Sequence, residues 1–587
     1  MKKIMTGTML AALVTLMTAC TQDDATNYNP YSNGQDNNNS GTADLGTGDL
    51  ATFTISVDKT SAEPTSSATA YYPESEDNLD DISNLQDFET EVTIDVANIS
   101  NGTINGVEIT NNNGTIVCNH GDKKVCYVLS GTNTNGSVTI TGSKKCEIKL
   151  NGVNITSPDS AALNVLCKKR CFIYLADGTT NTLTDTKCEE SNEHKGALYC
   201  KGKLLFHGTG SLSVYGHHNN AIHSADYIIF NKGVNVYANS TANHGIKAND
   251  GIFVNGGIIN VEVSAAAAKG INCESHVIIN GGRTTSITTG SGAYDTTDQD
   301  AKGAAAIKAD STFTINDGVV MLKSTGSGGK GLSTDFASTF NGGSLYVITS
   351  GNQYSYSSKK TAKPKGIKSD GNLTVNGGAI TIRTTGTYAE GIESKAVMTI
   401  NNGSVASYSK QDDAINSADN MTISGGFVLG YSSGNDGIDA NGNCYIKGGN
   451  IYAICSGSPE VAIDANTEGG YKLYLTGGNI IAIGGLENGS QLSQSCYQAS
   501  WSNNTWYALN TGSNVIAFQT PTTGGSGLVV SSASTPSLTS GVTVSNGTVC
   551  FGGLGYHNST TSGGSTVSLS SYTGGNMGGG MPGRPGR

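Results

Sequence analysis

Acidic and amide side chains recur at a nearly constant distance in the second half of this 587-residue chain. They lie in the segments EGIE (390–393), DAIN (413–416), DGID (436–439) and AID (462–464). Carboxylate and amide oxygens are the ligands that calcium prefers in proteins. The pattern therefore predicts a calcium site, and a solvated acidic stripe is the alternative. The predicted ligands are Glu390, Glu393, Asp413, Asn416, Asp436, Asp439 and Asp464, with Asp295, Asp298 and Asp300 as a weaker second group.

Lysines occupy the corresponding positions in the preceding part of the chain, namely Lys308, Lys330, Lys365 and Lys368. The sequence shows no carboxylate immediately beside each of them. We expect ammonium groups stacked in this way to attract anions. A glycan that contains uronic acids repeats its carboxylates along an extended chain and would match such a row. A mixed Lys/Asp surface without a ligand is the alternative.

Three loops are longer than their counterparts, at 180–195, 289–304 and 349–364, and each precedes one of the charged positions. Loops that lengthen at one place in a repeat build a wall beside a groove. The second and third loops contain Tyr294, Tyr354 and Tyr356. Exposed tyrosines stack on sugar rings, so we expect these three to contact a glycan. Capping of the loops is the alternative.

The charged positions belong to a sequence repeat of about 24 residues. Each unit contains three short apolar runs separated by turns, and such a unit is too short for a propeller blade of about 40 residues. The predicted fold is all-β: a right-handed, single-stranded parallel β-helix with three strands per coil and about 12 or more coils. An Asn before the glycines of most units would form a ladder of side-chain amides. The aliphatic residues that define the repeat are Leu163, Leu198, Ile222, Ile246, Ile271, Ile307, Leu332, Ile367, Ile392, Ile415, Ile438 and Ile463.

The composition agrees with this fold, because 79 of the residues are Gly and only 12 are Phe. The net charge of −12 argues against nucleic acid as a partner. We expect a monomer. The chain divides into a lipoprotein signal peptide (1–20), a flexible tether (21–50), an N-terminal β region or cap with irregular first coils (51–160), the regular β-helix (161–483), a C-terminal irregular β region or cap (484–572) and a disordered tail (573–587).

The first 20 residues are typical of a bacterial lipoprotein signal. Two lysines and an apolar stretch precede LMTAC (16–20), which predicts cleavage before Cys20 and its lipidation. Secretion without a lipid is the alternative. The following TQDD (21–24) resembles an acidic sorting signal for the outer cell surface. The predicted location is therefore the outer membrane, with the protein anchored to the cell surface by lipid. The other 12 cysteines leave disulfide pairing open.

Several segments together resemble the bacterial β-helical carbohydrate-binding domain family. They are CYVLSGTNTNGSVTI (126–140), KLNGVNITSPDSAALNV (149–165), LADGTTNTLTD (175–185), GIKSDGNLTVNGG (366–378) and DGIDANGNCYIKGG (436–449). The resemblance implies a right-handed β-helix related to pectate lyases, bound calcium, and binding of cellulose or acidic sugars without catalysis. The acidic residues of EGIE, DAIN and DGID are the best match to the calcium ligands of that family.

Three functions from different classes remain open at this point. The leading hypothesis is a surface lipoprotein that binds acidic or plant-cell-wall polysaccharide on a calcium-bearing face. A second is a pectate-type polysaccharide lyase, in which Lys365 or Lys368 would be the base and calcium would neutralise the substrate acid. A third is a non-catalytic adhesin or structural rod.

Overall fold

The structure is a computed structural model that describes residues 53–73, 88–186 and 194–574. The predictions for Cys20, the signal peptide, the tether and the tail beyond residue 574 lie outside the described residues. Within the described part the regular secondary structure is almost entirely β-strand, with two short 3-10 helices, η1 (Thr467–Gly469) and η2 (Phe551–Gly553). No helix in this part is long and apolar enough to cross a membrane.

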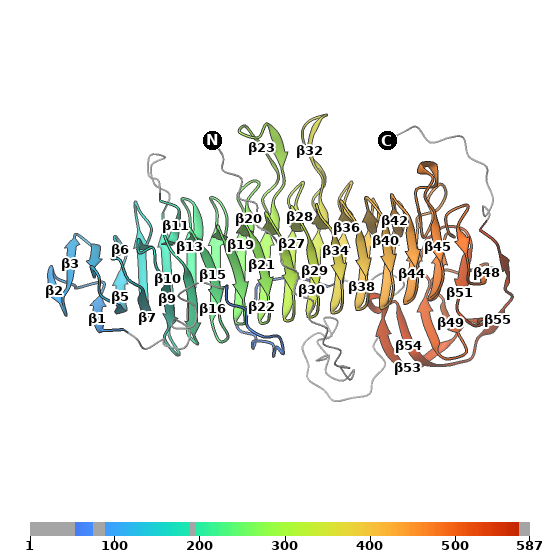
Figure 1. Cartoon of the computed structure of the whole chain (residues 1–587), viewed down its shortest axis with the longest axis horizontal. Coiled ribbons are helices and arrows are strands. Elements are labelled where there is room, and N and C mark those ends of the chain that lie inside the picture. Colours follow the sequence, from blue (N-terminus) through green and yellow to red (C-terminus); the bar gives the residue numbers. More distant parts are fainter. Residues whose placement is uncertain (1–52, 74–87, 187–193, 575–587) are drawn as a thin grey trace, which may run out of the picture. The chain divides into compact units, whose positions relative to one another are not determined.

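The strands wind into a parallel β-solenoid of about 14 turns (Figure 1), which confirms the predicted fold class. A representative coil consists of β25 (Ala305–Ala309), β26 (Phe313–Ile315) and β27 (Val319–Ser324). Each strand pairs in parallel with its counterpart in the next coil, β28 (Lys330–Thr334), β29 (Ser338–Phe340) and β30 (Ser344–Thr349). Each repeat unit therefore forms three strands, as the sequence predicted.

The first strand of each coil belongs to one 15-stranded sheet, here called the groove sheet. The second and third strands belong to a 31-stranded sheet. The groove sheet consists of β2 (Gly102–Ile104), β3 (Val107–Asn112), β4 (Thr115–Asn119), β6 (Ser137–Thr141), β8 (Leu163–Val165), β11 (Gly196–Cys200), β14 (Asn220–Ser224), β17 (Ile246–Ala248), β20 (Lys269–Cys273), β25, β28, β33 (Lys365–Ser369), β36 (Glu390–Ser394), β39 (Ile415–Ser417) and β42 (Ile438–Ala440).

One aliphatic column fills the interior behind the groove sheet. Ile307, Leu332, Ile367 and Ile392 are partners in successive strands, and each is almost completely buried. Because side chains alternate along a strand, the residues between them in register point to the outer face. The aliphatic column thus fixes which side chains face the groove.

Side-chain amides form a continuous ladder in one turn of the solenoid, as the sequence predicted. Asn280 Nδ2 donates a hydrogen bond to Asn255 Oδ1 at 2.9 Å. Four further bonds of 2.8 Å continue this row through Asn316, Asn341, Asn376 and Asn401. Each bond joins neighbouring coils, so the ladder reinforces the same register as the backbone.

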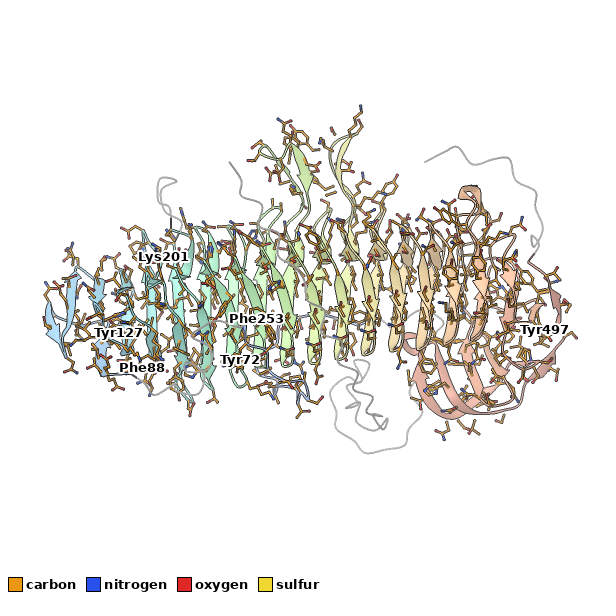
Figure 2. All side chains as sticks on the ribbon, viewed as in Figure 1. Tyr72, Phe88, Tyr127, Lys201, Phe253 and Tyr497 are labelled. Carbon is orange, nitrogen blue, oxygen red and sulfur yellow. The ribbon has the colours of Figure 1, made fainter. Side chains whose placement is uncertain are left out.

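Residues 53–73 form an extended strap on the outside of the solenoid. Ile55 is only 2% exposed and packs against Val319, Met321 and Tyr346. Further along the strap, the Glu63 carboxylate accepts hydrogen bonds from two turn N–H groups. Tyr72 joins Phe88 and Phe253 in one apolar cluster, and Figure 2 labels all three.

The parallel coils begin with β1 (Thr90–Asp95), which pairs in parallel with β5 (Val125–Asn133). The last parallel partner is β47 (Gln491–Leu492). After it, a six-stranded antiparallel sheet packs on the last coils. This sheet consists of β49 (Trp506–Asn510), β50 (Val515–Gln519), β52 (Ser537–Ser540), β53 (Thr543–Cys550), β54 (Gly555–Ser562) and β55 (Ser565–Val567). The eleven described cysteines are buried and free.

Candidate functional site

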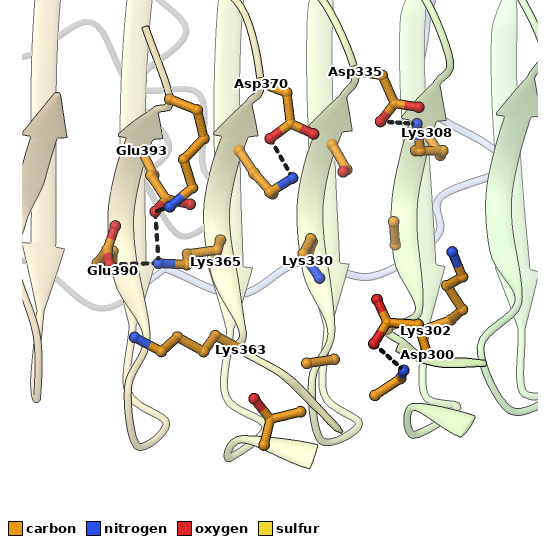
Figure 3. Close-up of a pocket in the computed structure, with 18 of the residues that line it drawn as sticks. Asp300, Lys302, Lys308, Lys330, Asp335, Lys363, Lys365, Asp370, Glu390 and Glu393 are labelled. Carbon is orange, nitrogen blue, oxygen red and sulfur yellow. Dashed lines mark hydrogen bonds and ion pairs between the residues drawn. The ribbon is translucent and has the colours of Figure 1, made fainter. Parts of the chain in front are cut away.

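A groove of about 830 Å³ lies on the outer face of the groove sheet (Figure 3). Its lining residues come from β20, β25, β28, β33 and β36 and continue to Asn416 and Asn441. The groove therefore runs along the stack of coils, across the strands. Eight lysines and five carboxylates line it, in a chain whose net charge is −12. This is a local excess of positive charge on an acidic protein.

Two antiparallel hairpins form a wall on one side of the groove. They are β23 (Ala293–Asp295) with β24 (Asp300–Lys302), and β31 (Tyr354–Ser357) with β32 (Lys360–Ala362). Figure 1 shows both projecting from the coils. Residues 300–303 and 361–363 contribute to the groove lining. Two of the three longer loops, 289–304 and 349–364, thus build the expected wall, and part of the first, 180–195, lies outside the described residues.

The three tyrosines of these loops are not among the residues that line the groove, and their contact with a sugar stays a prediction. The rings of Tyr294 and Tyr356 stack on each other, with centroids 3.9 Å apart and planes 15° apart. Asp300 and Lys360 form a second link between the hairpins, at 3.6 Å. The stacking of Tyr294 on Tyr356 therefore links the two hairpins of the wall.

Side chains of the groove sheet form two columns in register. The first column consists of Lys269, Ala305, Lys330, Lys365 and Glu390. The second consists of Lys247, Asn272, Lys308, Ser333, Lys368, Glu393, Asn416 and Asp439. All four lysines predicted to bind a glycan line the groove. The predicted change from basic to acidic residues occurs between β33 and β36.

Lys365 marks this change of sign. Its ammonium is paired with Glu390 at 2.5 Å and with Glu393 at 3.3 Å, and all three side chains are at most 6% exposed. Burial opposes the charge on Lys365, but the two carboxylates outweigh it and raise the pKa of the amine. Burial also opposes ionisation of Glu393, yet Lys365 and Lys395 lower its pKa. A permanently protonated Lys365 is unsuited to act as a base.

Two other lysines also have carboxylate partners, contrary to the expectation of unaccompanied ammonium groups. Lys308 Nζ lies 2.8 Å from Asp310 and 2.6 Å from Asp335. Lys368 Nζ lies 2.5 Å from Asp370. These partners stand two residues further along the strand or in the next coil. Because side chains two apart share a face of a strand, the pairing follows directly from the backbone geometry.

Lys330 and Lys269 differ from their neighbours, since neither has an ion pair with a carboxylate in the described part of the chain. Both donate to backbone carbonyls instead: Lys330 to Gly328 O at 3.4 Å, and Lys269 to Ala267 O and to Gly303 O. Figure 3 draws dashed lines from Lys365 and none from Lys330. Burial and neighbouring lysines lower the pKa of Lys330 to about 7 and that of Lys269 to about 8.

Three carboxylates gather where the first column turns acidic, and we call them the acid cluster: Glu390, Asp412 and Asp413. One oxygen from each lies within 4.8 Å of the others, and no other such group occurs among the described residues. Burial, followed by the charges of Asp439, Asp436 and Asp412, raises the pKa of Asp413 well above its usual value. Asp412 was missed from the sequence, although it directly precedes Asp413 in QDDAIN (411–416).

The remaining predicted ligands lie beside the acid cluster rather than within it. Glu393 faces Lys365 and Lys395. The Asn416 amide donates to Glu390 at 3.4 Å, and the Asp436 N–H donates to Asp413 at 3.3 Å. Asp439 and Asp464 follow Asn416 in successive coils. Asp295, Asp298 and Asp300 do not form a comparable group in the described residues.

The burial of these acids differs from the solvated stripe that the sequence suggested. Glu390 is 5% exposed, Asp413 1% and Asp436 3%. Side chains of adjacent coils cover one another on the outer face, because strands lie only about 4.8 Å apart. Buried charges at this spacing need counter-ions, protons or ligands.

Replacing Lys365 tests how strongly the groove depends on this ion pair. We expect Lys365→Met to destabilise the fold by about 3–5 kcal/mol, because it leaves Glu390 buried without its counter-ion and leaves Glu393 with Lys395 alone. The two carboxyls then bind protons more tightly in the folded than in the unfolded state, so the loss is smaller near about pH 5 than at about pH 8. Urea denaturation at both pH values measures it.

Lys368→Met is the matched control, since its pair with Asp370 is partly exposed and in the same groove. We expect a loss below about 1 kcal/mol there. Equal losses for both variants would contradict the role given to Lys365.

Two segments of the chain are similar in sequence to known proteins, and only the second contains residues that line the groove. Residues 107–267 and 357–437 match the model of a family described as carbohydrate-binding domain-containing protein. A carbohydrate-binding domain-containing protein of Acetivibrio thermocellus is 33% identical over 103 residues, which are 16% of this chain. The match spans 36% of that relative, about a third of its length.

A solved structure, of the polysaccharide lyase-like protein from C. thermocellum as a gadolinium derivative, aligns with 53% of this chain and 96% of that chain. The sequence identity is 15% and the TM-score is 0.28. The family match in 357–437 contains Lys365, Glu390 and Asp413. The chain is thus similar in sequence to a carbohydrate-binding family over two segments, the second of which holds the centre of the groove.

Proposed function

We propose that this chain binds an acidic polysaccharide in the groove, without cleaving it. The observation that carries the proposal is the pair of lysines without carboxylate partners, Lys269 and Lys330, on the floor of a groove that crosses several coils. An extended polymer would lie along such a groove and offer repeated carboxylates. The sequence similarity to a carbohydrate-binding family supports the same class of ligand.

The lysine–aspartate ion pairs of the groove can bind the neutral hydroxyl groups of a sugar chain. Lys308 with Asp335, and Lys368 with Asp370, place donors and acceptors side by side at the surface. Sugar hydroxyls both donate and accept hydrogen bonds, so each pair can bind a neutral hydroxyl group. The exposed position of the aspartates makes these ion pairs weak enough to rearrange around a ligand.

Binding should depend on pH because the two lysines change charge near neutrality. We expect the affinity for uronate-containing oligosaccharides to rise as the pH falls through about 8 and about 7, the pKa values of Lys269 and Lys330. The carboxylates of the sugar stay ionised over this range. Isothermal titration calorimetry with a set of such oligosaccharides, from alkaline to slightly acidic pH, measures the change.

Lys330→Met should remove the step near neutral pH and weaken binding by about tenfold at the acidic end of the range. Lys447→Met is the matched control, because Lys447 is exposed outside the groove. Affinity that is the same at all pH values, or that falls equally in both variants, would contradict the proposed site.

We further propose that the acid cluster holds a calcium ion beside the groove. Glu390, Asp412 and Asp413 would supply oxygen ligands, and such hard donors suit calcium. The crowding of buried carboxylates around Asp413 supports this fit, since a divalent cation would relieve the repulsion that now raises the pKa of that group. The ion would add positive charge at the acidic end of the groove.

Asp413→Asn separates the calcium site from a merely acidic surface. In chelator, we expect the variant to melt at a higher temperature than the wild type, because asparagine avoids the cost of burying this carboxyl group, whether ionised or protonated, among other acids. Added calcium should raise the melting temperature of the wild type and leave the variant unchanged. Asp419→Asn, at an exposed neighbouring acid, should keep the calcium response. A calcium response in the Asp413 variant would exclude this cluster.

A polysaccharide lyase is the second candidate, and one observation favours Lys330 as its base over Lys365 or Lys368. A base must be neutral before it accepts a proton, and the lowered pKa of Lys330, about 7, meets this condition. Lyase cleavage produces an unsaturated sugar that absorbs ultraviolet light. If this product appears on incubation with uronate polymers and is lost in Lys330→Ala, the protein is a lyase and not only a binding protein.

We also propose that a lipid at Cys20 displays the groove on the outer cell surface. The signal-like residues 1–20 and the acidic TQDD that follows support this location. Mass spectrometry of the mature N-terminal peptide tests it, since an unmodified cysteine or an intact signal would oppose it.

A further inference from the structure

One exposed tyrosine borders the groove at the level where its lining turns acidic. Tyr388 lies in the turn between β35 (Ala379–Thr384) and β36, two residues ahead of Glu390. The tyrosine is 57% exposed, whereas Glu390 beside it is 5% exposed. Exposed aromatic surface at the edge of a groove is available to a ligand that lies in that groove.

The residues two positions ahead of the first column form a row along the wall side of the groove, here called the rim. The column is in register, so these residues occupy equivalent places in successive coils. The rim consists of Ala267, Gly303, Gly328, Lys363 and Tyr388. A Cβ atom added to Gly303 would lie only 2.1 Å from the carbonyl oxygen of Gly328, so there is no space for a side chain there. Tyr388 is therefore the one aromatic residue of the rim.

Lys363 connects the ring of Tyr388 with the groove. Its Nζ lies 5.6 Å from the ring centroid, within the range of a cation–π contact. Lys363 itself lines the groove (Figure 3). The turn that carries the ring is also tied to the base of the wall, because Thr387 N donates to Asn352 Oδ1 at 3.1 Å and Gln353 N donates to Thr387 Oγ1 at 3.3 Å. The ring is thus held beside the groove.

The backbone of Tyr388 has a conformation that tyrosine seldom adopts. Its φ is +56°, in the left-handed region, where a bulky side chain costs stability. The equivalent rim residues Gly328 and Ala267 have φ values of +72° and +53°. Glycine adopts this conformation without the cost. Folding alone therefore gives no reason for a tyrosine at this position.

We propose that the ring of Tyr388 packs against the apolar face of one pyranose ring of the polysaccharide in the groove. This inference rests on the proposed binding of an acidic polysaccharide and adds a contact that does not depend on charge. A pyranose presents C–H groups on one face, and these pack well on an aromatic ring. The level of Tyr388 suits such a contact, because Glu390 and Glu393 are already neutralised by Lys365 and Lys395.

The test measures the affinity for a panel of uronate oligosaccharides, among them oligogalacturonate and hyaluronan fragments, by isothermal titration calorimetry at slightly acidic pH. We expect Tyr388→Ala to weaken binding about tenfold, both at low and at high ionic strength, because salt does not screen an apolar contact. Tyr388→Phe keeps the ring and should bind as tightly as the wild type. Tyr71→Ala is the matched control, since Tyr71 is 42% exposed on the strap, and it should leave the affinity unchanged.

Tyr388→Gly separates binding from folding. Glycine removes the ring and also relieves the backbone, so the variant should melt at the same temperature as the wild type or at a higher one. Its affinity should nevertheless fall about tenfold, as in Tyr388→Ala. The loss of affinity in Lys330→Met should instead shrink at high ionic strength, because that contact is between charges.

The outcomes distinguish this inference from the function on which it rests. Unchanged affinity in Tyr388→Ala, a loss that Tyr388→Phe shares, or a loss that disappears at high ionic strength would overturn the stacking contact and leave acidic-polysaccharide binding in place. A lower melting temperature of Tyr388→Gly with unchanged affinity would assign the ring to folding alone. Absence of binding of every uronate ligand to the wild type would overturn both.

Discussion

Stacking in register is the constraint on which the rest of the structure depends. Each groove-sheet residue lies about 4.8 Å from its counterparts in the coils before and after it. Two like charges at that distance repel by roughly 3–4 kcal/mol at an effective dielectric constant near 20. The chain meets this constraint in three ways along one sheet. Ala305 interrupts a lysine column, Asp310 and Asp335 neutralise Lys308, and Glu390 reverses the sign next to Lys365.

The repulsion between stacked like charges is relieved to different extents at the two ends of the groove. On the basic side, most ammonium groups have carboxylate partners, and the two that lack one respond with lowered pKa values. On the acidic side, burial and neighbouring acids raise the pKa values of Asp413 and Asp436. Unrelieved charge of opposite sign therefore lies at the two ends of one surface. This polarity gives a reason for an anionic ligand and a cation to bind near each other.

The fold and the order of the site residues along the stack of coils could be predicted from the sequence. A repeat with constant spacing between its apolar positions allows only one alignment of each coil on the next. Ile307, Leu332 and Ile367 defined the coils, and the residues after them defined the outward columns. Pairing within the columns was harder to predict. The partners of Lys308 stand two residues away and in the next coil, and the burial of Glu390 depends on neighbours that no periodicity reveals. The strap had no repeat at all, so its extended path over distant coils left no signal.

The strap also decides how the solenoid responds to tension. Its residues run from Phe53, beside Tyr346, to Tyr72, beside Asn231, against the direction in which the coils follow one another. A force applied to the chain ahead of Phe53 would thus reach interior coils before any terminal coil. Apolar contacts at Ile55 and hydrogen bonds at Glu63 and Tyr71 would share the load in shear. A pull at a solenoid end would instead peel one coil at a time, so this attachment protects the grooved coils from mechanical unravelling.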